Sequence, residues 1–459
     1  MQKVAIIGGG ISGLSAAWTL QKKEIAFTLF EASERIGGAI RTLHEADCLI
    51  EAGPNSLSGP HPELDRLISE LGLQSEYCPA NAEANKRFIV RNGQPIAVPH
   101  SPLSFLRTPL FSTRAKWRLL AEPFICSRAV PGESLAAFAE RRMGKEPLAY
   151  ALNPFVSGIY AGDPEALLVE TAFPTLLQME KKHGSLLRAL LHRSKQRRRS
   201  GEPRKPRTIY SFTNGMQTLP DRLAEKIGDA IQTHHPVTTI QQKDGVWLIE
   251  NQRFNDIIFT LPAHAQTQLD IPFDLSFLAS IRYPAVTSLS LLYRRDQLTH
   301  PLNGFGMLVP ACEERFILGV LFPSSIFPDR APDECALLTV FVGGDRTPER
   351  AYLPKADLIS RVEADLQELV GLSGNAQHVR ISRWEQAIPQ YTQEIKACHS
   401  QLDDIESDFP GIHFAGNYRD GISIAQSIES GRKVAERIIE RYSSGKETCS
   451  RPTLGRRIK

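Results

Sequence analysis

The chain has 459 residues, of which 42% are hydrophobic and 23% are charged. This composition is globular and long enough for about two to four domains, and it excludes a disordered chain, a collagen-like chain and a bundle of membrane-spanning helices. The 54 Lys and Arg residues barely exceed the 51 Asp and Glu residues, so net charge alone does not indicate a nucleic-acid-binding protein.

The first thirty residues predict a strand, a helix and a second strand. Residues 3–7 form a β-branched run typical of a central parallel strand, residues 14–20 have helical character, and residues 27–30 form the next strand. Glu31 ends this second strand, where a carboxylate can accept hydrogen bonds from an adenosine ribose. This order predicts an α/β fold with a Rossmann-type dinucleotide-binding domain.

A G-x-G-x-x-G motif, residues 8–13, joins the first strand to the helix. Gly8 permits the tight turn, Gly10 lets the backbone approach a pyrophosphate, and Gly13 lets the helix and the strand pack closely. The N-terminus of the helix then presents free N–H groups to the phosphates. The apolar N-terminal run is broken by these glycines, so we expect no signal or transit peptide.

A second glycine pair, Gly37 and Gly38, follows the second strand and is flanked by Arg35 and Arg41. A domain that binds NAD alone does not usually need another close backbone approach at this point. FAD is longer, and its diphosphate and ribityl chain need one. Because either arginine could offset phosphate charge, the segment favours FAD.

Residues 100–207 are predicted to be helical, with two unusual features. Apolar side chains crowd between residues 103 and 120, which fits either a buried helix face or a surface that dips into one membrane leaflet. Residues 188–207 hold nine Lys or Arg and one Glu, which fits either a solvated loop or attachment to anionic lipid. This run lacks interleaved aromatic residues, so we do not expect nucleic-acid binding.

The rest of the chain predicts further strands and turns. Asp244-Gly245 between apolar runs indicates a hairpin, and a helix is expected over 219–228. Strands are expected at 288–293 and 336–342. The apolar stretch 335–342 is far shorter than the roughly 20 residues that span a bilayer.

Cysteine usage points to a reducing compartment. The seven cysteines are scattered, and neither they nor the histidines show the spacing of a metal site. We therefore expect reduced thiols, no metal, and a cytoplasmic protein.

Several longer stretches resemble one family. EASERIGGAIRT (31–42) is similar to the dinucleotide signature of the flavin amine oxidase and phytoene desaturase superfamily. The chain is further similar to the oxygen-dependent protoporphyrinogen and coproporphyrinogen III oxidases at NPFVSGIYAGDP (153–164), EKKHGS (180–185), FTNGMQTLP (212–220), RW with IPQY (383–391), and FAG with IESG (414–431).

The resemblance implies oxidation of protoporphyrinogen IX to protoporphyrin IX by molecular oxygen in haem biosynthesis, with FAD as cofactor. Coproporphyrinogen III oxidation to coproporphyrin III is the alternative within the family. The matched segments carry no extra basic residues for two additional propionates, which favours protoporphyrinogen. A flavin amine oxidase or carotenoid desaturase, and a non-catalytic flavin-binding partner of haem synthesis, are alternatives of other classes.

The motifs and the resemblance together predict three regions. The FAD-binding domain is discontinuous (1–80, 208–265 and 395–442), an α+β substrate domain covers 85–99 and 266–394, a helical membrane-associating domain covers 100–207, and a flexible tail covers 443–459. We expect one non-covalent FAD, bound by Gly8, Gly9, Gly10, Ile11, Ser12, Gly13, Glu31, Ala32, Arg35, Gly37, Gly38, Ala39, Arg41, Gly53, Pro54, Asn55, Ser56, Val237 (on a strand), Trp384, Gly416, Ile422, Ser423 and Ile424.

The same resemblance implies a largely apolar substrate wall, because a porphyrinogen is large and charged only at its propionates. Its candidate residues are Phe155, Gly158, Phe305, Gly306 and Leu308, with an ordinary sheet core as the alternative for Phe305 and Leu308. No catalytic side chain is predicted, since flavin N5 accepts the hydride. His183, His234 and His235 are expected at the surface.

Two expectations concern the C-terminal flavin motif and the partners. Gly421 should open the last helix toward the flavin, so Gly421→Glu is expected to lose flavin or activity. The expected partners are the porphyrinogen, oxygen and the cytoplasmic face of a membrane. A contact with ferrochelatase is considered because protoporphyrin is reactive, and either a monomer or a homodimer is compatible with the sequence.

Overall fold

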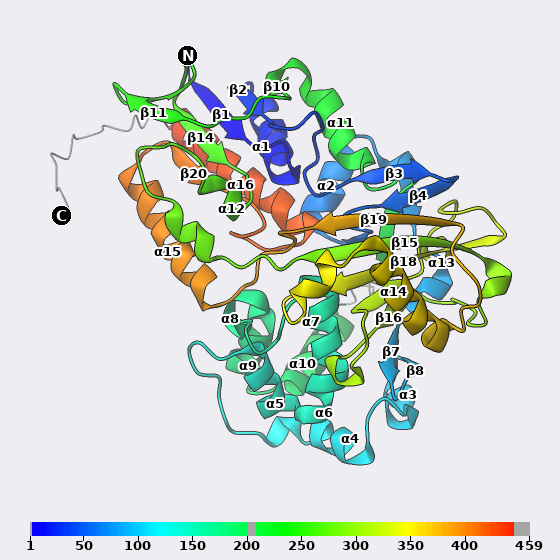
Figure 1. Ribbon diagram of the computed structural model, residues 1–459. Helices are drawn as coiled ribbons and strands as arrows, with labels where there is room; N and C mark the ends of the chain where they lie inside the picture. Colours follow the sequence, from blue (N-terminus) through cyan, green and yellow to red (C-terminus); the bar gives the residue numbers. More distant parts are fainter. Residues whose placement is uncertain (1, 201–207, 445–459) are drawn as a thin grey trace.

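The computed structural model describes residues 2–200 and 208–444 (Figure 1). The predicted basic segment is therefore described only to residue 200, and the predicted tail only to residue 444.

A five-stranded parallel sheet combines strands from the N-terminal, middle and C-terminal parts of the described chain. Its order is β10-β2-β1-β14-β20, with β10 (Ile231–Gln232), β2 (Ala26–Phe30), β1 (Lys3–Ile7), β14 (Asp256–Phe259) and β20 (Ile412–Phe414). Every neighbouring pair is parallel. The β-branched and aromatic residues of β1 and β14 are buried on both faces, as central parallel strands require.

Two long helices cover this sheet together. α1 (Ile11–Gln21) follows β1, and α16 (Ile424–Ser443) packs against α1. The approach is close because Gly431 has no side chain: a Cβ there would lie 2.0 Å from the Ser12 carbonyl oxygen. Asp256 fixes the far end of α16 by accepting hydrogen bonds from Arg441 and Tyr442.

A mixed seven-stranded sheet forms the centre of the molecule (Figure 1). Its order is β19 (His378–Trp384), β15 (Val286–Arg294), β18 (Cys335–Gly343), β17 (Gly319–Leu321), β16 (Gly306–Leu308), β7 (Phe88–Arg91) and β8 (Gln94–Ala97). The predicted strands at 288–293 and 336–342 pair antiparallel as β15 and β18. Helix α14 (Lys355–Val370) buries its apolar face in the core of this sheet.

Smaller elements connect the two sheets. The hairpin predicted at Asp244-Gly245 is present, and both turn residues have positive φ, 52° and 77°. The elements are β3 (Thr42–Glu45), β4 (Cys48–Glu51), β5 (Leu57–Gly59), β6 (Tyr77–Pro79), β9 (Thr208–Phe212), β11 (Ile240–Lys243), β12 (Val246–Ile249), β13 (Gln252–Phe254), α2 (Pro62–Glu70), α11 (Thr218–Ile227), α12 (Ala263–Gln266), α13 (Pro323–Ile326) and α15 (Gln393–Asp408).

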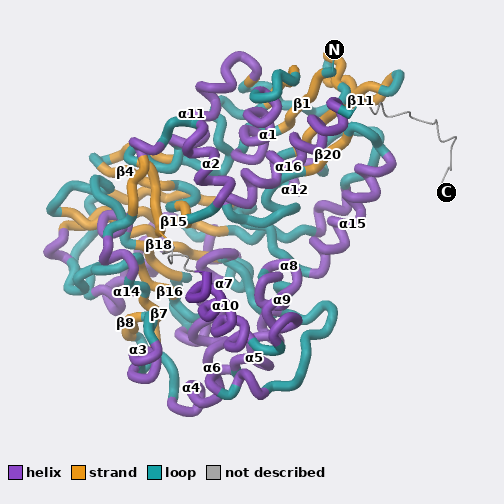
Figure 2. Tube along the Cα trace, turned by 180° about the vertical axis from the view of Figure 1, so that it is seen from behind, coloured by secondary structure: helices purple, strands orange, loops and turns teal. Residues whose placement is uncertain are grey.

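Helices gather at the end of the molecule opposite the parallel sheet (Figures 1 and 2). They are α3 (Pro102–Arg107), α4 (Thr113–Leu120), α5 (Leu135–Met143), α6 (Lys145–Pro147), α7 (Asn153–Tyr160), α8 (Val169–Ala172), α9 (Pro174–His183) and α10 (Leu186–Ser200). Within the described ranges, no helix is both long and apolar enough to cross a membrane.

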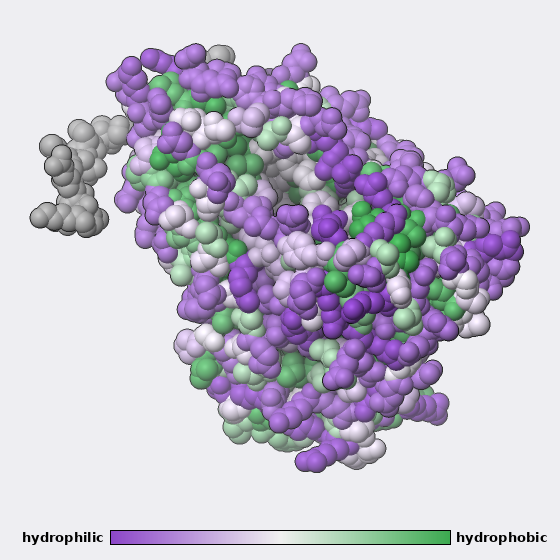
Figure 3. Space-filling view, in the orientation of Figure 1, coloured by the Kyte–Doolittle hydropathy of each residue, from purple (hydrophilic) through white to green (hydrophobic). Residues whose placement is uncertain are grey.

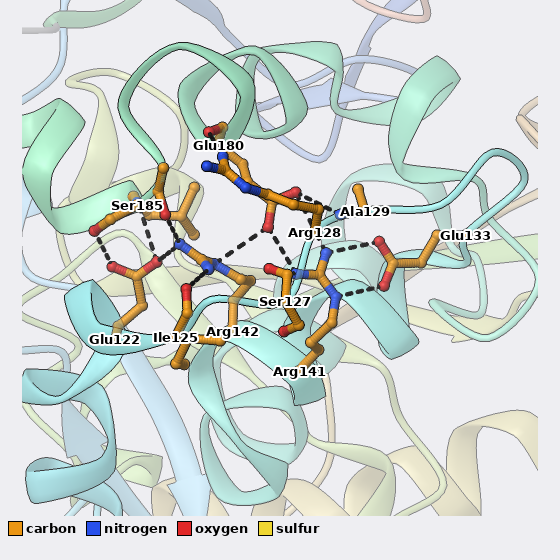
Figure 4. Close-up of polar contacts among 12 residues, drawn as sticks. Glu122, Ile125, Ser127, Arg128, Ala129, Glu133, Arg141, Arg142, Glu180 and Ser185 are labelled. Carbon is orange, nitrogen blue, oxygen red and sulfur yellow. Dashed lines mark hydrogen bonds and ion pairs between the residues drawn. The ribbon is translucent and has the colours of Figure 1, made fainter.

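Buried charges hold these helices together (Figure 4). Arg141 of α5 binds Glu133 through two hydrogen bonds of 2.8 Å, and both Arg141 and Arg142 contact Glu180. Glu122 pairs with Arg142 and accepts the backbone N–H groups of Leu186 and Leu187, at 2.9 and 3.1 Å, at the start of α10. The EKKHGS segment thus contributes structural residues: Glu180 joins the network, and Ser185 donates a hydrogen bond to Glu122.

Candidate active site

The glycine motif forms the turn from β1 into α1. Gly8 has a φ of 110°, and its N–H donates to the Phe30 carbonyl oxygen at 2.8 Å. A Cβ at Gly13 would lie 2.0 Å from the Gly8 carbonyl oxygen, so helix and strand could not approach this closely with any other residue. At Gly10, which precedes α1, a Cβ would meet no atom within 4 Å. The space beside Gly10 is therefore open to a ligand.

Glu31 organises the edge of this turn. Its Oε2 accepts the Gly9 N–H at 2.7 Å, and its Oε1 accepts the backbone N–H of Ser33 at 2.9 Å. The first turn of α1 carries neither a capping side chain nor an acidic residue. An anion at this helix end would meet free N–H groups and no fixed negative charge on the helix.

The second glycine pair lies directly against the first. Gly10 and Gly37 form a β-bridge, and the Gly37 N–H donates to the Gly9 carbonyl oxygen at 2.8 Å. A Cβ at Gly53 would lie 1.9 Å from the Ala39 carbonyl oxygen. Three predicted cofactor segments, 8–13, 37–41 and 53–56, are therefore stacked with backbone against backbone.

The two flanking arginines differ in their surroundings. Arg35 donates to the carbonyl oxygens of Gly38 at 2.7 Å and Ile40 at 2.8 Å, so its guanidinium closes the loop that contains Gly37. Arg41 is exposed. Of the two, Arg41 is the one left free to offset phosphate charge, and that role stays a prediction.

One predicted element is wrong. Val237 does not lie on a strand but on an irregular segment that follows β10, where it is half-buried. Pro236 has no N–H to donate to a ladder, and His234 has a φ of 54°, which turns the chain. The segment still runs beside the cradle, because the His235 N–H donates to the Glu31 carbonyl oxygen at 2.8 Å.

The three histidines expected at the surface are not alike. His234 is exposed, whereas His183 and His235 are half-buried. The His235 ring lies 5.0 Å from the Phe30 ring, next to Glu31.

The C-terminal motif reaches the same region. Gly416 has a φ of 132°, and its N–H donates to Ser430 Oγ at 3.0 Å. Ser423 caps α16 by accepting the Gln426 N–H at 3.2 Å, so the helix begins immediately after it. Trp384, at the end of β19, donates from Nε1 to the Ala52 carbonyl oxygen at 2.9 Å, beside Gly53.

The predicted substrate residues divide between a helix and a sheet. Phe155 and Gly158 lie on an exposed face of α7, whereas Gly306 and Leu308 belong to β16. A Cβ at Gly158 would lie 2.7 Å from Leu308 Cδ2, so helix and strand touch at this glycine. Phe305 is half-buried just before β16.

Two of the resembling segments meet in space. Gln390 donates from Nε2 to the Tyr160 carbonyl oxygen at 2.8 Å, and Gly162 leaves room for the Gln390 amide. Tyr391 donates to the Asn417 carbonyl oxygen at 2.6 Å, next to Gly416. The NPFVSGIYAGDP and IPQY segments thus hold α7 beside the C-terminal motif.

A narrow pocket, with only about 10 Å³ of water-sized free space, brings predicted cofactor and substrate residues together. Asn55 and Ser56 line it with Phe305, and so do two charged residues that the sequence did not single out, Glu51 and Arg330. Burial raises the pKa of Glu51 to about 7, against the hydrogen bonds that it accepts from the Met216 N–H and the Thr42 hydroxyl. Arg330 falls in no recognisable motif, and Glu51 opens the E-x-G-P stretch at 51–54, in which only Gly53 and Pro54 were assigned roles from the sequence.

These features fit a flavin dinucleotide. A pyrophosphate fits the open side of Gly10 and the uncapped start of α1. A ribose fits beside the carboxylate of Glu31. The second glycine loop extends the backbone cradle toward Trp384 and Asn55, which an NAD-only site does not need.

The comparison with protein families decides the assignment. Residues 11–439 match the family described as flavin containing amine oxidoreductase. The chain belongs to this family. It is therefore an oxidoreductase with a flavin cofactor, and the predicted α/β class is confirmed.

Individual relatives show which members of the family the chain is similar to. The chain is 32% identical to protoporphyrinogen oxidase 2, chloroplastic/mitochondrial, of Arabidopsis thaliana, over 98% of this chain and 95% of the relative. It is 27% identical to coproporphyrinogen III oxidase of Bacillus subtilis, over 94% and 96%. A crystal structure of a candidate protoporphyrinogen oxidase from Exiguobacterium sp. 255-15 has the same fold, with a TM-score of 0.80, 24% identity, and coverage of 95% and 98%. The predicted resemblance is confirmed.

Proposed function

We propose that this flavoprotein oxidises protoporphyrinogen IX to protoporphyrin IX, with FAD as a non-covalent cofactor and molecular oxygen as the final electron acceptor. The observation that carries the proposal is the junction of a dinucleotide cradle with an apolar substrate wall: Asn55 and Ser56 line one pocket together with Phe305. The names of the protoporphyrinogen oxidases among the relatives support the choice of substrate.

Non-covalent FAD is supported by the parts of the cradle. Gly8 to Gly13 and Glu31 would hold the pyrophosphate and the ribose, and the loop at Gly37 and Gly38 would hold the rest of the diphosphate and the ribityl chain. When bound, the flavin supplies a hydride acceptor.

The residues of this chain do the remaining work. α7 and β16 would place the apolar macrocycle and keep water away, since Phe155, Phe305 and Leu308 offer no charge. The N-terminus of α16 would favour negative charge on a group next to Ser423. No side chain is assigned as a proton acceptor.

Coproporphyrinogen III is the second candidate substrate, since a coproporphyrinogen III oxidase is among the relatives. The test is direct: purified protein is given each porphyrinogen in air, and porphyrin fluorescence is followed against a no-enzyme control. We expect faster fluorescence gain with protoporphyrinogen IX. Equal or greater turnover of coproporphyrinogen III would reverse the choice, and no gain above autoxidation with either would refute the proposal.

We also propose that the helical end of the molecule attaches to a membrane surface. Of the predicted apolar run, Leu110 and Phe111 are buried, so part of it is core. Phe105 and Leu119 are half-buried, and the other four, Leu103, Leu106, Trp117 and Leu120, are exposed on α3 and α4. Phe124 and Val130 are exposed in the segment that follows. Figure 3 shows hydrophobic residues among hydrophilic ones along the lower margin of the molecule.

Basic residues accompany these apolar side chains. On α10, Arg188, Arg193 and Lys195 are exposed beside Leu190 and Leu191, which are 53% and 61% exposed. Apolar side chains inserted at the headgroup level, with cations that attract anionic lipid, are the usual basis of peripheral attachment. A partner that receives the product, ferrochelatase included, and the oligomeric state stay predictions.

A further inference from the structure

A buried arginine outside every recognised motif lies in the pocket of the candidate site. Arg330 is only 3% exposed, and it lines the pocket with Asn55, Ser56 and Phe305. It follows α13 in a segment that packs between β4 and the central sheet. A cation in such a place has lost its hydration and needs acceptors within the protein or from a ligand.

The acceptors available to Arg330 satisfy only part of its guanidinium. Nη2 donates to Ser211 Oγ at 2.9 Å and to the Phe212 carbonyl oxygen at 3.1 Å. The guanidinium also lies over the Phe327 ring, 5.1 Å from its centroid. Nη1, by contrast, is buried and has no hydrogen-bond partner among the described residues. One face of a fixed cation is therefore left for an anion.

Glu51 does not fill this position. Its Oε1 is 3.9 Å from Arg330 Nη1, beyond hydrogen-bond reach. The Met216 N–H and the Thr42 hydroxyl both donate to Glu51 at 2.8 Å and hold the carboxyl where it is. The other titratable groups that act on Arg330 are Cys78 and Asp329, and Asp329 is exposed.

We propose that Arg330 binds a carboxylate of the substrate in this pocket, with Asn55 and Ser56 as additional hydrogen-bond donors. The inference rests on the proposed function, because a porphyrinogen carries carboxylates on short aliphatic arms. The pocket is narrow, with only about 10 Å³ of water-sized free space, so it could receive the carboxylate end of such an arm but not a whole tetrapyrrole. Phe305, Ile326 and Phe327 would enclose the methylene groups of the arm. A guanidinium gives a carboxylate charge-assisted hydrogen bonds, which are stronger than neutral ones.

The test compares ligands with and without free carboxylates. Binding of protoporphyrin IX and of its dimethyl ester to the flavin-loaded protein is measured by fluorescence. Loss of a charge-assisted hydrogen bond should weaken free-acid binding about tenfold or more in Arg330→Gln, while ester binding stays within about twofold. An unchanged preference for the free acid in Arg330→Gln would overturn the proposal.

Arg350 provides the matched control. It donates to two backbone carbonyl oxygens, at 2.8 and 3.1 Å, where Arg330 donates to one hydroxyl and one carbonyl oxygen, and like Arg330 it lies over a phenylalanine ring, that of Phe316. It does not line the pocket. Arg350→Gln should therefore leave the preference for the free acid unchanged, and an equal loss in this variant would assign the effect to folding and overturn the proposal.

A second variant acts in the opposite direction. Glu51→Gln keeps one acceptor oxygen, which can serve the Met216 N–H, places its NH2 group beside the Thr42 hydroxyl, and removes the negative charge that competes for Arg330. At pH about 8.5, where Glu51 is ionised, this variant should bind the free acid several-fold more tightly than the wild type does. If Arg330→Gln fails to fold, this variant carries the test, and unchanged or weaker binding overturns the proposal.

The proposed function is checked separately in the same preparation. If the wild-type protein oxidises a porphyrinogen and the Arg330→Gln variant keeps the wild-type preference for the free acid over the ester, the carboxylate site alone is refuted. Wild-type protein that oxidises neither porphyrinogen refutes the proposed function and the carboxylate site with it.

Discussion

Glu31 shows how one side chain sets the geometry of a whole turn. It accepts the Gly9 N–H and the Ser33 N–H through different oxygens, so it joins the turn between β1 and α1 to the end of β2. Its identity and spacing were readable from the sequence. Its dual bonding was not, because Gly9 lies far away along the chain.

Removing this carboxylate should release the dinucleotide. Glu31→Ala is expected to lose most bound flavin, because the ribose loses an acceptor and the Gly9 N–H loses its partner. Flavin absorbance per mole of purified protein measures the effect. Glu70→Ala, which removes an acid bonded to Trp18 and Lys22 on the outside of α2, is the control and should keep its flavin. Full flavin content in Glu31→Ala would contradict this placement.

Glu51 should make stability depend on pH. Its pKa is raised from 4.5 to about 7, so the folded state holds the proton more tightly than the unfolded state does. The resulting stability is present below the unfolded pKa and is lost as the pH rises through about 7.

The Glu51→Gln variant isolates this effect. Relative to the variant, the wild-type free energy of unfolding should fall by on the order of 3 kcal/mol between pH about 5 and about 8. Denaturant titrations at each pH measure it. Glu45→Gln, at a half-buried ion pair with Arg380, is the control and should show little change. Parallel wild-type and Glu51→Gln curves would contradict the raised pKa.

At the scale of elements, the sequence predicted what local pattern determines. The strands β1, β2, β15 and β18 are apolar runs bounded by breakers, and each is where the pattern places it. The prediction of a strand at Val237 was wrong because Pro236 and the positive φ of His234 prevent a regular strand there. Contacts between elements that are distant in the sequence could not be predicted, because no local sequence pattern indicates them.

The buried network of the helical region illustrates that limit. Glu122, Arg142 and Glu180 stand on three separate elements, and each alone looks like an ordinary surface charge on an amphipathic helix. The EKKHGS segment was recognised by resemblance, but its structural role appears only when Glu180 and Ser185 are seen with their partners (Figure 4).

The start of α16 gives a prediction at this scale. Gly421 has a φ of 126°, and a Cβ there would lie 2.3 Å from Gln426 Nε2, whose side chain caps the helix with Ser423. Gly421→Glu would strain the backbone, displace the cap and place a carboxylate that competes with the flavin for the N-terminus of α16. We expect lost flavin or activity. Gly72→Glu, at another positive-φ glycine with open space around its Cβ position, is the control, and a yellow, fully active Gly421→Glu protein would contradict the placement.

At the scale of the molecule, the near-neutral net charge conceals an uneven surface. The helical region, which lies away from the parallel sheet (Figure 2), carries exposed apolar side chains together with exposed bases on α10. The sequence predicted this region but could not separate buried from exposed positions within it. That separation depends on how α3 and α4 pack against their neighbours.

Membrane attachment can be tested by sedimentation with vesicles that contain phosphatidylglycerol. Trp117→Glu combined with Phe124→Glu should reduce the bound fraction about tenfold or more, because two side chains, 68% and 79% exposed, would no longer insert. Tyr352→Glu, at a 51% exposed residue outside the helical region, should bind as the wild type does. Equal binding by all three proteins would contradict the proposed surface.

The central claim joins the flavin cradle to porphyrinogen oxidation, and anaerobic mixing tests it most directly. Protoporphyrinogen IX added to the yellow protein without oxygen should bleach the flavin absorbance while porphyrin fluorescence rises, and air should then restore the absorbance. Flavin that stays oxidised in the presence of protoporphyrinogen IX and of coproporphyrinogen III, yet is bleached by chemical reductant, would contradict the account.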